Sequence, residues 1–190
     1  MKFNLILFEG SDIIKFGMKR EELQAILQVK PKLFKKTEFD LFDTEDYSEI
    51  CHVFYEVGEN NTPVCAAIEF FKPSLLYLDG NQLIGVNKDK VEALFQSKFD
   101  DCVSDGSGIS STKYDIAFFA PKKTVASVYI ARKGYSEEQD AYLKKAFDEK
   151  YNTAEEDDDP SMQTFMCPNC LKFIKARECI KCPDCNVDMI

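Results

Sequence analysis

Two pairs of cysteines within residues 167–185 constrain the chain more than any other feature of its sequence. Cys167 and Cys170 form the first pair, Cys182 and Cys185 form the second, and each pair is a Cys-Pro-x-Cys turn. Such a turn directs two thiolates at one point, because the proline fixes the backbone angle that the turn needs. Two such turns supply the four sulfur ligands of a tetrahedral Zn²⁺ site. The sequence therefore predicts one Zn²⁺ ion, which is expected to be structural because cysteine takes all four positions.

A fifth cysteine in the same stretch leaves an alternative open. Cys179 also forms a C-x-x-C spacing with Cys182, and in that arrangement Cys185 would be the spare thiol. The proline at position 183 favours the pairing of Cys182 with Cys185. Cys179 is then expected to pack as an ordinary side chain.

Cysteine usage and the lack of long apolar runs indicate a compartment. The other three cysteines, Cys51, Cys65 and Cys102, are scattered along the chain. A dense cysteine cluster in a reducing compartment is typical of a metal site. The first residues lack a signal-peptide pattern, and no apolar run approaches the roughly 20 residues of a membrane helix. We expect a cytoplasmic protein without a membrane partner.

Composition divides the chain into two modules. Residues 151–163 hold an unbroken acidic run and almost nothing apolar. Such a stretch cannot bury enough surface to offset its loss of conformational entropy, so we interpret it as a solvated linker. A domain of residues 1–150 precedes it, and a small module of residues 164–190 follows it. The net charge of −9 disfavours bulk attraction to nucleic acids, although it allows a local basic surface.

Two segments of residues 1–150 resemble each other at a constant offset. Phe16–Leu27 and Ile84–Phe95 each have a glycine in second place, Gly17 and Gly85, and then apolar residues three and four positions apart. This spacing gives one apolar face and predicts a short helix in each segment. β-Branched and aromatic runs around turn residues follow each helix. They predict two hairpins, formed by 50–55 with 64–71 and by 114–119 with 124–130.

The repeated order of helix and hairpin predicts an α+β fold. The two units are expected to join edge to edge in one antiparallel sheet with helices on one face. A strand over residues 3–8 is expected to extend an edge. Residues 137–151 are predicted to form a closing helix, which Ser136 and Gln139 would cap.

Both modules resemble known folds. Residues 165–190 resemble a zinc ribbon with turns of the rubredoxin-knuckle kind, a motif that is specific for metal but occurs in proteins of many functions. Residues 13–135, through the two glycine-led helices and their hairpins, resemble the tandem repeats of the β-lactamase-inhibitor-like fold. The second resemblance implies a sheet whose concave, aromatic-rich face holds a partner protein. The chain lacks the secretion signal, lipidation cysteine and disulfide pairs of those families, so no inhibitor residue is transferred to it.

Residues that catalysis commonly uses are sparse. His52 is the single histidine, and it follows Cys51 in a predicted strand, so the two side chains are expected on opposite faces. The sequence contains no phosphate-binding loop, dinucleotide fingerprint or nucleophile elbow. We therefore expect no enzymatic activity.

Two functions of different classes remain. The first is a protein-interaction module of the inhibitor or immunity kind, whose acidic surface would suit a basic partner. The alternative is a nucleic-acid-associated factor that binds through basic residues between the cysteine pairs, namely Lys172, Lys175, Arg177 and Lys181. We favour the first, because four thiolates with one Zn²⁺ carry a charge of about −2, which cancels much of this basic charge.

Overall fold

The computed structural model describes residues 1–151, 163–166 and 173–176. The chain divides into two compact units, Met1–Phe147 and Asp148–Ile190, and each is described by itself. The larger unit combines helices with a large antiparallel sheet. The predicted α+β class is therefore confirmed.

The first half of the larger unit has the predicted helix and hairpin, with short strands added. Its elements are β1 (Lys2–Ile6), β2 (Gly10–Ser11), α1 (Arg20–Leu27), β3 (Lys32–Phe34), β4 (Thr44–Asp46), β5 (Cys51–Val57), the 3₁₀ turn η1 (Glu59–Asn61) and β6 (Pro63–Phe71). The prediction of α1, β5 and β6 is confirmed. The strands β2, β3 and β4 have no counterpart in the prediction from sequence.

The second half repeats this order of strands and helix. Its elements are β7 (Leu75–Leu78), β8 (Asn81–Gln82), α2 (Lys88–Lys98), β9 (Val103–Ser104), β10 (Gly108–Ser111), β11 (Ile116–Phe119) and β12 (Ser127–Ala131). Each half thus begins with a short strand pair, continues with one helix and ends with four strands. The helix and hairpin predicted for this half are confirmed as α2, β11 and β12.

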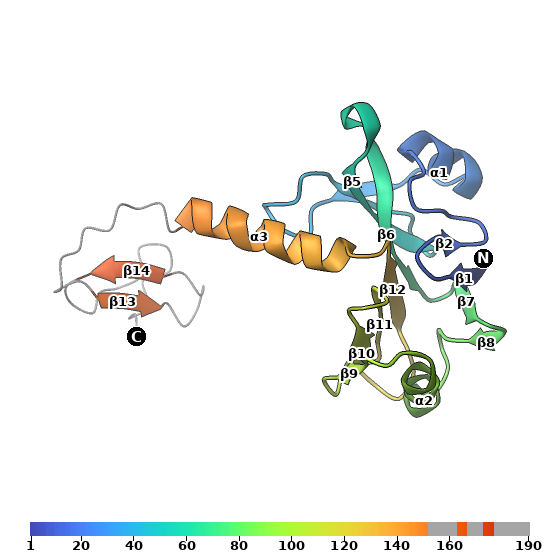
Figure 1. Cartoon of the computed structure of the whole chain (residues 1–190). Helices are drawn as coiled ribbons and strands as arrows, with labels where there is room; N and C mark the ends of the chain where they lie inside the picture. Colours follow the sequence, from blue (N-terminus) through green and yellow to red (C-terminus); the bar gives the residue numbers. More distant parts are fainter. Residues whose placement is uncertain (152–162, 167–172, 177–190) are drawn as a thin grey trace. The chain divides into compact units, whose positions relative to one another are not determined.

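The two halves join in one eight-stranded sheet. Its strand order is β3-β4-β5-β6-β12-β11-β10-β9, so the second half appears in reverse order beside the first. The strands β6 and β12 are antiparallel and pair at the centre, where Glu69 lies opposite Tyr129. Figure 1 shows these two strands meeting in the middle of the unit. The predicted edge-to-edge junction is confirmed.

Gly17 and Gly85 hold equivalent positions before the two helices. Their φ angles are +85° and +82°, a left-handed conformation that glycine adopts without steric cost. The amide of Gly17 donates to the carbonyl of Cys65 over 2.8 Å, and the amide of Gly85 donates to the carbonyl of Val125 over 2.9 Å. Cys65 in β6 and Val125 just before β12 are therefore equivalent positions in the two hairpins.

One core lies between the eight-stranded sheet and the elements that cover it. Side chains of α1 and α2 pack there, with Leu23 and Phe95 fully buried. A second sheet of order β2-β1-β7-β8 contributes Phe3, whose ring centroid lies 4.7 Å from that of Phe70 in β6. We call the side of the large sheet that faces this core the inner face and the opposite side the outer face.

The predicted place of the first strand is wrong. β1 does not extend an edge of the large sheet, because it pairs with β7 in parallel at the centre of the four-stranded sheet. The register sets Phe3 beside Leu76, and both side chains are fully buried. Burial of these apolar side chains against the core outweighs an edge position, where one face would be exposed to water.

The closing helix α3 (Tyr135–Tyr151) forms as predicted but differs in its cap and its position. The carboxylate of Asp115, in the turn between β10 and β11, accepts hydrogen bonds from the amides of Gly134 and Ser136, in place of a Ser136 and Gln139 cap. The first residue, Tyr135, packs with Ala67 and belongs to a separate cluster from the core. The helix therefore begins over the outer face, so the prediction that the helices share one face holds for α1 and α2 only.

In the smaller unit the structure describes two short strands. β13 (Gln163–Met166) and β14 (Phe173–Ala176) pair antiparallel, with Phe165 opposite Ile174. The first predicted cysteine pair therefore lies in the connection between them. The predicted linker 151–163 falls outside the described residues except for its two end residues, and all five cysteines of 167–185 fall outside them.

Candidate functional site

The outer face of the large sheet carries polar and aromatic side chains. Along β5 the alternation buries Cys51 and Val53 in the core and leaves His52 and Phe54 half-buried on the outer face. The predicted separation of Cys51 and His52 onto opposite faces is confirmed. On β6 the same alternation places Glu69 on the outer face.

Two carboxylates with an imidazole between them form a row across three strands of this face, which we call the charged row. Asp46 pairs with His52, and His52 pairs with Glu69, so the imidazole lies between two carboxylates. Its Nε2 is 3.7 Å from Asp46 Oδ1, and its Nδ1 is 3.6 Å from Glu69 Oε2. The rings of Phe34 and Phe71 flank the imidazole, with centroids 5.2 and 4.7 Å away. The register of the strands therefore builds a compact cluster from residues far apart in sequence.

Glu69 is the centre of this cluster. The nearby imidazole of His52 lowers the pKa of Glu69 to about 2, against the opposing effect of burial, and the ammonium of Lys36 and the hydroxyl of Ser127 act in the same direction as His52. Ser127 Oγ donates to Glu69 Oε1 over 2.9 Å, and Lys36 Nζ lies 3.4 Å from Glu69 Oε2. The carboxylate therefore stays ionised well below neutral pH.

Glu69→Gln should flatten the loss of stability in acid. Because the folded-state pKa of Glu69 is depressed, its stabilising contribution is complete above its ordinary value of 4.5 and disappears as the pH falls towards 2. Urea midpoints followed by circular dichroism should therefore drop more between pH 5 and pH 2.5 in the wild type than in Glu69→Gln. Equal drops in the two proteins would contradict this assignment.

The second half of the unit has the equivalent strands but lacks the charged row. Counted from the equivalent positions Cys65 and Val125, Glu69 corresponds to Tyr129. The strand neighbour of Tyr129 is Ala117, which takes the place of His52. The charged row is therefore not a requirement of the hairpin, because the same hairpin forms with an alanine and a tyrosine.

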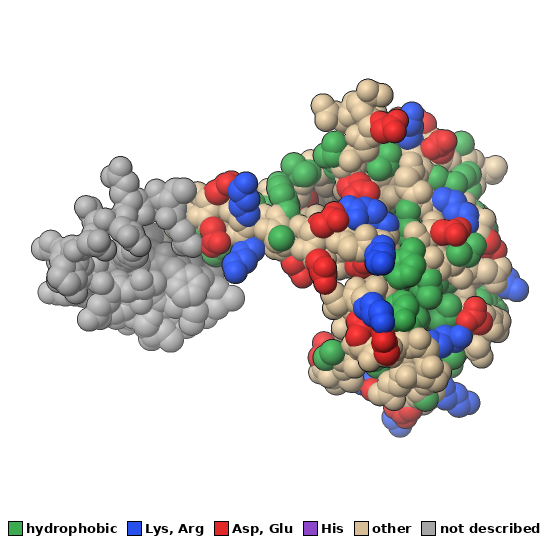
Figure 2. Space-filling model, viewed as in Figure 1, with side chains coloured by type: hydrophobic (Ala, Val, Ile, Leu, Met, Phe, Trp, Pro, Cys, Tyr) green, Lys and Arg blue, Asp and Glu red, His purple; other side chains and the backbone are tan. Residues whose placement is uncertain are grey.

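A pocket of about 240 Å³ opens beside the charged row on the outer face. Its floor includes Phe54 and Tyr129, whose ring centroids are 6.0 Å apart. Tyr135 and Leu143 of α3 form one wall of the pocket. The exposed side chains of Val57 and Leu41 lie at its rim. Figure 2 shows hydrophobic side chains gathered where the chain between β3 and β4, light blue in Figure 1, approaches α3. We call this site the outer-face pocket.

Charged contacts fix α3 beside the pocket. Arg132 Nε lies 2.7 Å from both carboxylate oxygens of Glu56 in β5, and the same guanidinium binds Glu138 in α3. Burial raises the pKa of Tyr135 to about 12, so its phenol stays neutral in the pocket wall. The wall that α3 provides is thus tied to β5 by an arginine with two carboxylate partners.

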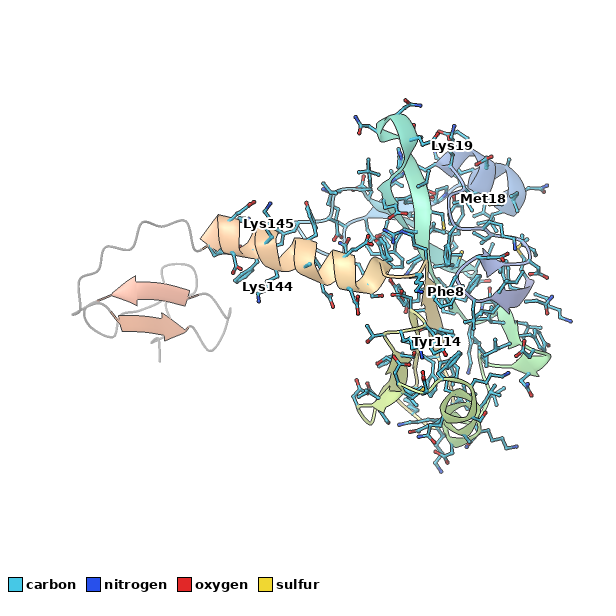
Figure 3. The ribbon with its side chains drawn as sticks, viewed as in Figure 1. Phe8, Met18, Lys19, Tyr114, Lys144 and Lys145 are labelled. Atoms are coloured by element: carbon cyan, nitrogen blue, oxygen red, sulfur yellow. The ribbon has the colours of Figure 1, made fainter. Side chains whose placement is uncertain are left out.

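A second hydrophobic patch has a structural explanation. Phe8, in the turn after β1, stacks on Tyr114 with ring centroids 6.1 Å apart, and Tyr114 in turn contacts Phe99. Figure 3 labels Phe8 and Tyr114 close together, and Figure 2 shows hydrophobic side chains gathered in that part of the surface. The patch is a contact between the two halves of the unit. The side shown in Figure 2 otherwise carries interspersed charges of both signs.

The described residues bring together none of the predicted metal ligands. Cys167, Cys170, Cys182 and Cys185 lie outside them, as do Cys179, Lys172, Arg177 and Lys181, while Lys175 belongs to β14. Within residues 1–151 and the two short strands, no group of three histidine, cysteine or acidic side chains is placed to hold a metal. No helix in the same part of the chain is long and apolar enough to cross a membrane.

Sequence reasoning identified His52 but not its partners. Glu69 is acidic within an apolar run, and this break in the pattern of β6 was the available signal. Lys36 and Tyr129 carried no comparable signal, because Tyr129 reaches the site through the register of β6 with β12 and Lys36 through the irregular segment between β3 and β4. Compared with protein-family models, with curated proteins and with solved structures, the chain matches none.

Proposed function

We propose that the chain is a non-enzymatic, cytoplasmic protein-interaction module that binds its partner through the outer face of the large sheet. The observation that supports this most is the outer-face pocket, with its aromatic floor and exposed apolar rim. Protein interfaces concentrate their binding energy in such pockets, where one partner side chain is buried inside a ring of weaker contacts. At about 240 Å³ the pocket is smaller than the roughly 300–1,000 Å³ of small-molecule sites, which favours a single protein side chain.

The polar contacts at the site favour binding over catalysis. A serine nucleophile needs a general base within hydrogen-bond reach of its hydroxyl. Ser127 donates to Glu69, but the lowered pKa of Glu69 makes this carboxylate too weak a base, and His52 faces two carboxylates rather than a hydroxyl. The buried thiols are also poor nucleophiles, because burial raises the pKa of Cys51 and Cys65.

Val57→Lys should abolish partner binding without unfolding the protein. Val57 is 52% exposed at the pocket rim, so a lysine there remains hydrated in the free protein but would be desolvated in a complex and would repel a basic partner. Affinity-tagged protein should capture a stoichiometric partner from the native host, quantified by mass spectrometry. The Val57→Lys variant should lose at least about 90% of that partner, since bringing like charges together in an interface costs several kcal/mol.

Val103→Lys provides the matched control. Val103 is 66% exposed on β9, the strand at the far edge of the sheet from β3. It receives the same change of side chain at a comparable exposure, and it should retain the partner. Capture that survives Val57→Lys, or that fails equally in both variants, would remove the outer face as the binding surface.

We further propose that the C-terminal module holds one structural Zn²⁺ through Cys167, Cys170, Cys182 and Cys185. Metal analysis of the purified protein should give about one zinc per chain, because four thiolates complete a tetrahedral site. Cys167→Ser and Cys185→Ser should each abolish the zinc. Cys179→Ser should keep it.

The same variants test the alternative ligand set. If Cys179→Ser loses the zinc and Cys185→Ser keeps it, the second pair is Cys179 with Cys182. A chelator should unfold only the C-terminal module, because metal binding and folding are coupled in a module of this size. Circular dichroism with and without chelator measures that loss.

A further inference from the structure

A cation of the chain itself already occupies one edge of the outer-face pocket. The ammonium of Lys36 lies 4.3 Å from the centroid of the Phe54 ring and 3.4 Å from Glu69 Oε2. An aromatic face and a carboxylate on two sides form a favourable site for a cationic side chain. Tyr129, which lies opposite Glu69 in the register, adds a second ring whose centroid is 6.0 Å from that of Phe54.

Lys36 is held weakly enough to be displaced. Its side chain is 47% exposed, and it comes from the irregular segment between β3 and β4. Ion pairs with this exposure contribute little, because water and salt compete for both charges. Lys36 can therefore leave the site without disturbing the sheet.

The charges around the pocket favour a cation as the incoming group. Arg132 is neutralised by Glu56 and Glu138 together, so it offers no free positive charge. Asp46 and Glu69 leave the charged row with an excess of carboxylate. The chain as a whole carries a net charge of −9, which raises the encounter rate with basic proteins.

We propose that the outer face binds an arginine side chain of a basic protein partner, which replaces Lys36 over the Phe54 ring and beside Glu69. This inference rests on the proposed function and names the chemistry of its partner. Arginine suits the site better than lysine, because a guanidinium stacks on an aromatic ring while it bonds a carboxylate. Tyr129, whose ring centroid lies 6.0 Å from that of Phe54, extends the apolar surface beside the stacking ring.

The test is a titration of the isotope-labelled full chain with N-acetyl-arginine methylamide, followed by NMR of the backbone amides. The control probe is N-acetyl-citrulline methylamide, which has nearly the same shape and no charge. The arginine probe should shift the amides of β5, β6 and β12 in a saturable manner. The citrulline probe should bind about tenfold more weakly, since it loses both the cation–π contact and the ion pair.

Two variants examine the proposed contacts. Glu69→Gln should weaken arginine binding about tenfold, because the paired carboxylate is lost. Lys36→Ala should strengthen it by up to about fivefold, because the competing cation is removed. Glu21→Gln is the matched control, because Glu21 is exposed on α1, which covers the inner face, and should leave the affinity unchanged.

The outcomes separate this inference from the proposed function. Equal binding of the two probes, or equal effects of Glu69→Gln and Glu21→Gln, would overturn the arginine site. The protein-interaction function would stand in that case if Val57→Lys still abolishes partner capture. Saturable, charge-dependent shifts that Lys36→Ala strengthens would support the arginine site.

Discussion

Glu45→Ile should lower the free energy of unfolding by about 3–5 kcal/mol, because it leaves buried donors without their acceptor. The side chain of Glu45 in β4 is 1% exposed. Its carboxylate accepts from the hydroxyl of Tyr47 over 2.6 Å and from the hydroxyl of Tyr55, and it pairs with Arg20 over 3.2 Å. Urea unfolding followed by far-ultraviolet circular dichroism measures the loss.

The tyrosine environment explains why the single change is so costly. Burial together with the hydrogen bonds to Glu45 raises the pKa of both Tyr47 and Tyr55, so both phenols stay protonated donors. Arg20 also stacks on the Tyr55 ring, 4.2 Å from its centroid. An isoleucine at position 45 would satisfy none of these donors, although it would fill the volume.

A combined variant separates lost hydrogen bonds from lost packing. In the second half of the unit, Ile109 pairs with Phe118 as Glu45 pairs with Val53, so an apolar residue suits this place in the fold. Adding Tyr47→Phe and Tyr55→Phe to Glu45→Ile removes two unsatisfied hydroxyls and should recover at least about 1 kcal/mol of the free energy of unfolding.

Glu21→Ala is the control, because Glu21 is exposed, and it should change the free energy of unfolding by less than about 0.5 kcal/mol. A Glu45→Ile loss no larger than that of Glu21→Ala would contradict the assignment.

Segments with clear periodicity were predictable from the sequence, and short strands were not. The helices show apolar residues three and four positions apart, and hairpin strands such as β6 are apolar runs of strand length between turn residues. The strands β2, β8 and β9 contain two residues each, which is too short for any period. The strand β4 was also not predicted, because a glutamate at position 45 suggests an exposed surface. Its burial becomes understandable only once the tyrosine and arginine donors around its carboxylate are known.

Contacts that depend on strand register or on turns far away in the chain could not be predicted from the sequence. His52 was predictable as an outer-face residue from the alternation of β5, but its pairing with Glu69 depends on a register that also includes a bulge at Phe54 and Tyr55. The cap of α3 comes from Asp115, which lies in a turn of another hairpin. Local rules favoured Ser136 for that cap because they consider only neighbouring residues.

Phe70→Ala should destabilise the larger unit by about 3–5 kcal/mol, whereas the adjacent Phe71→Ala should cost only about 1 kcal/mol. Phe70 is fully buried between the two sheets against Phe3, so its removal leaves a cavity that the packed strands cannot fill. Phe71 is half-buried on the outer face, where its ring contacts the imidazole of His52. Urea unfolding by circular dichroism compares the two variants directly.

The same pair of variants distinguishes residues that hold the fold from residues that serve the surface. If the outer face binds the partner, Phe71→Ala should remain folded yet capture less partner. The change removes apolar area from the outer face and also removes the ring that packs against His52 of the charged row. Equal losses of stability for the two variants would mean that a further layer covers the outer face as completely as the core elements cover the inner one. A large difference in stability, with binding lost in the more stable variant, would place the function of the larger unit on the outer face, where the charged row of the first half has no equivalent in the second half.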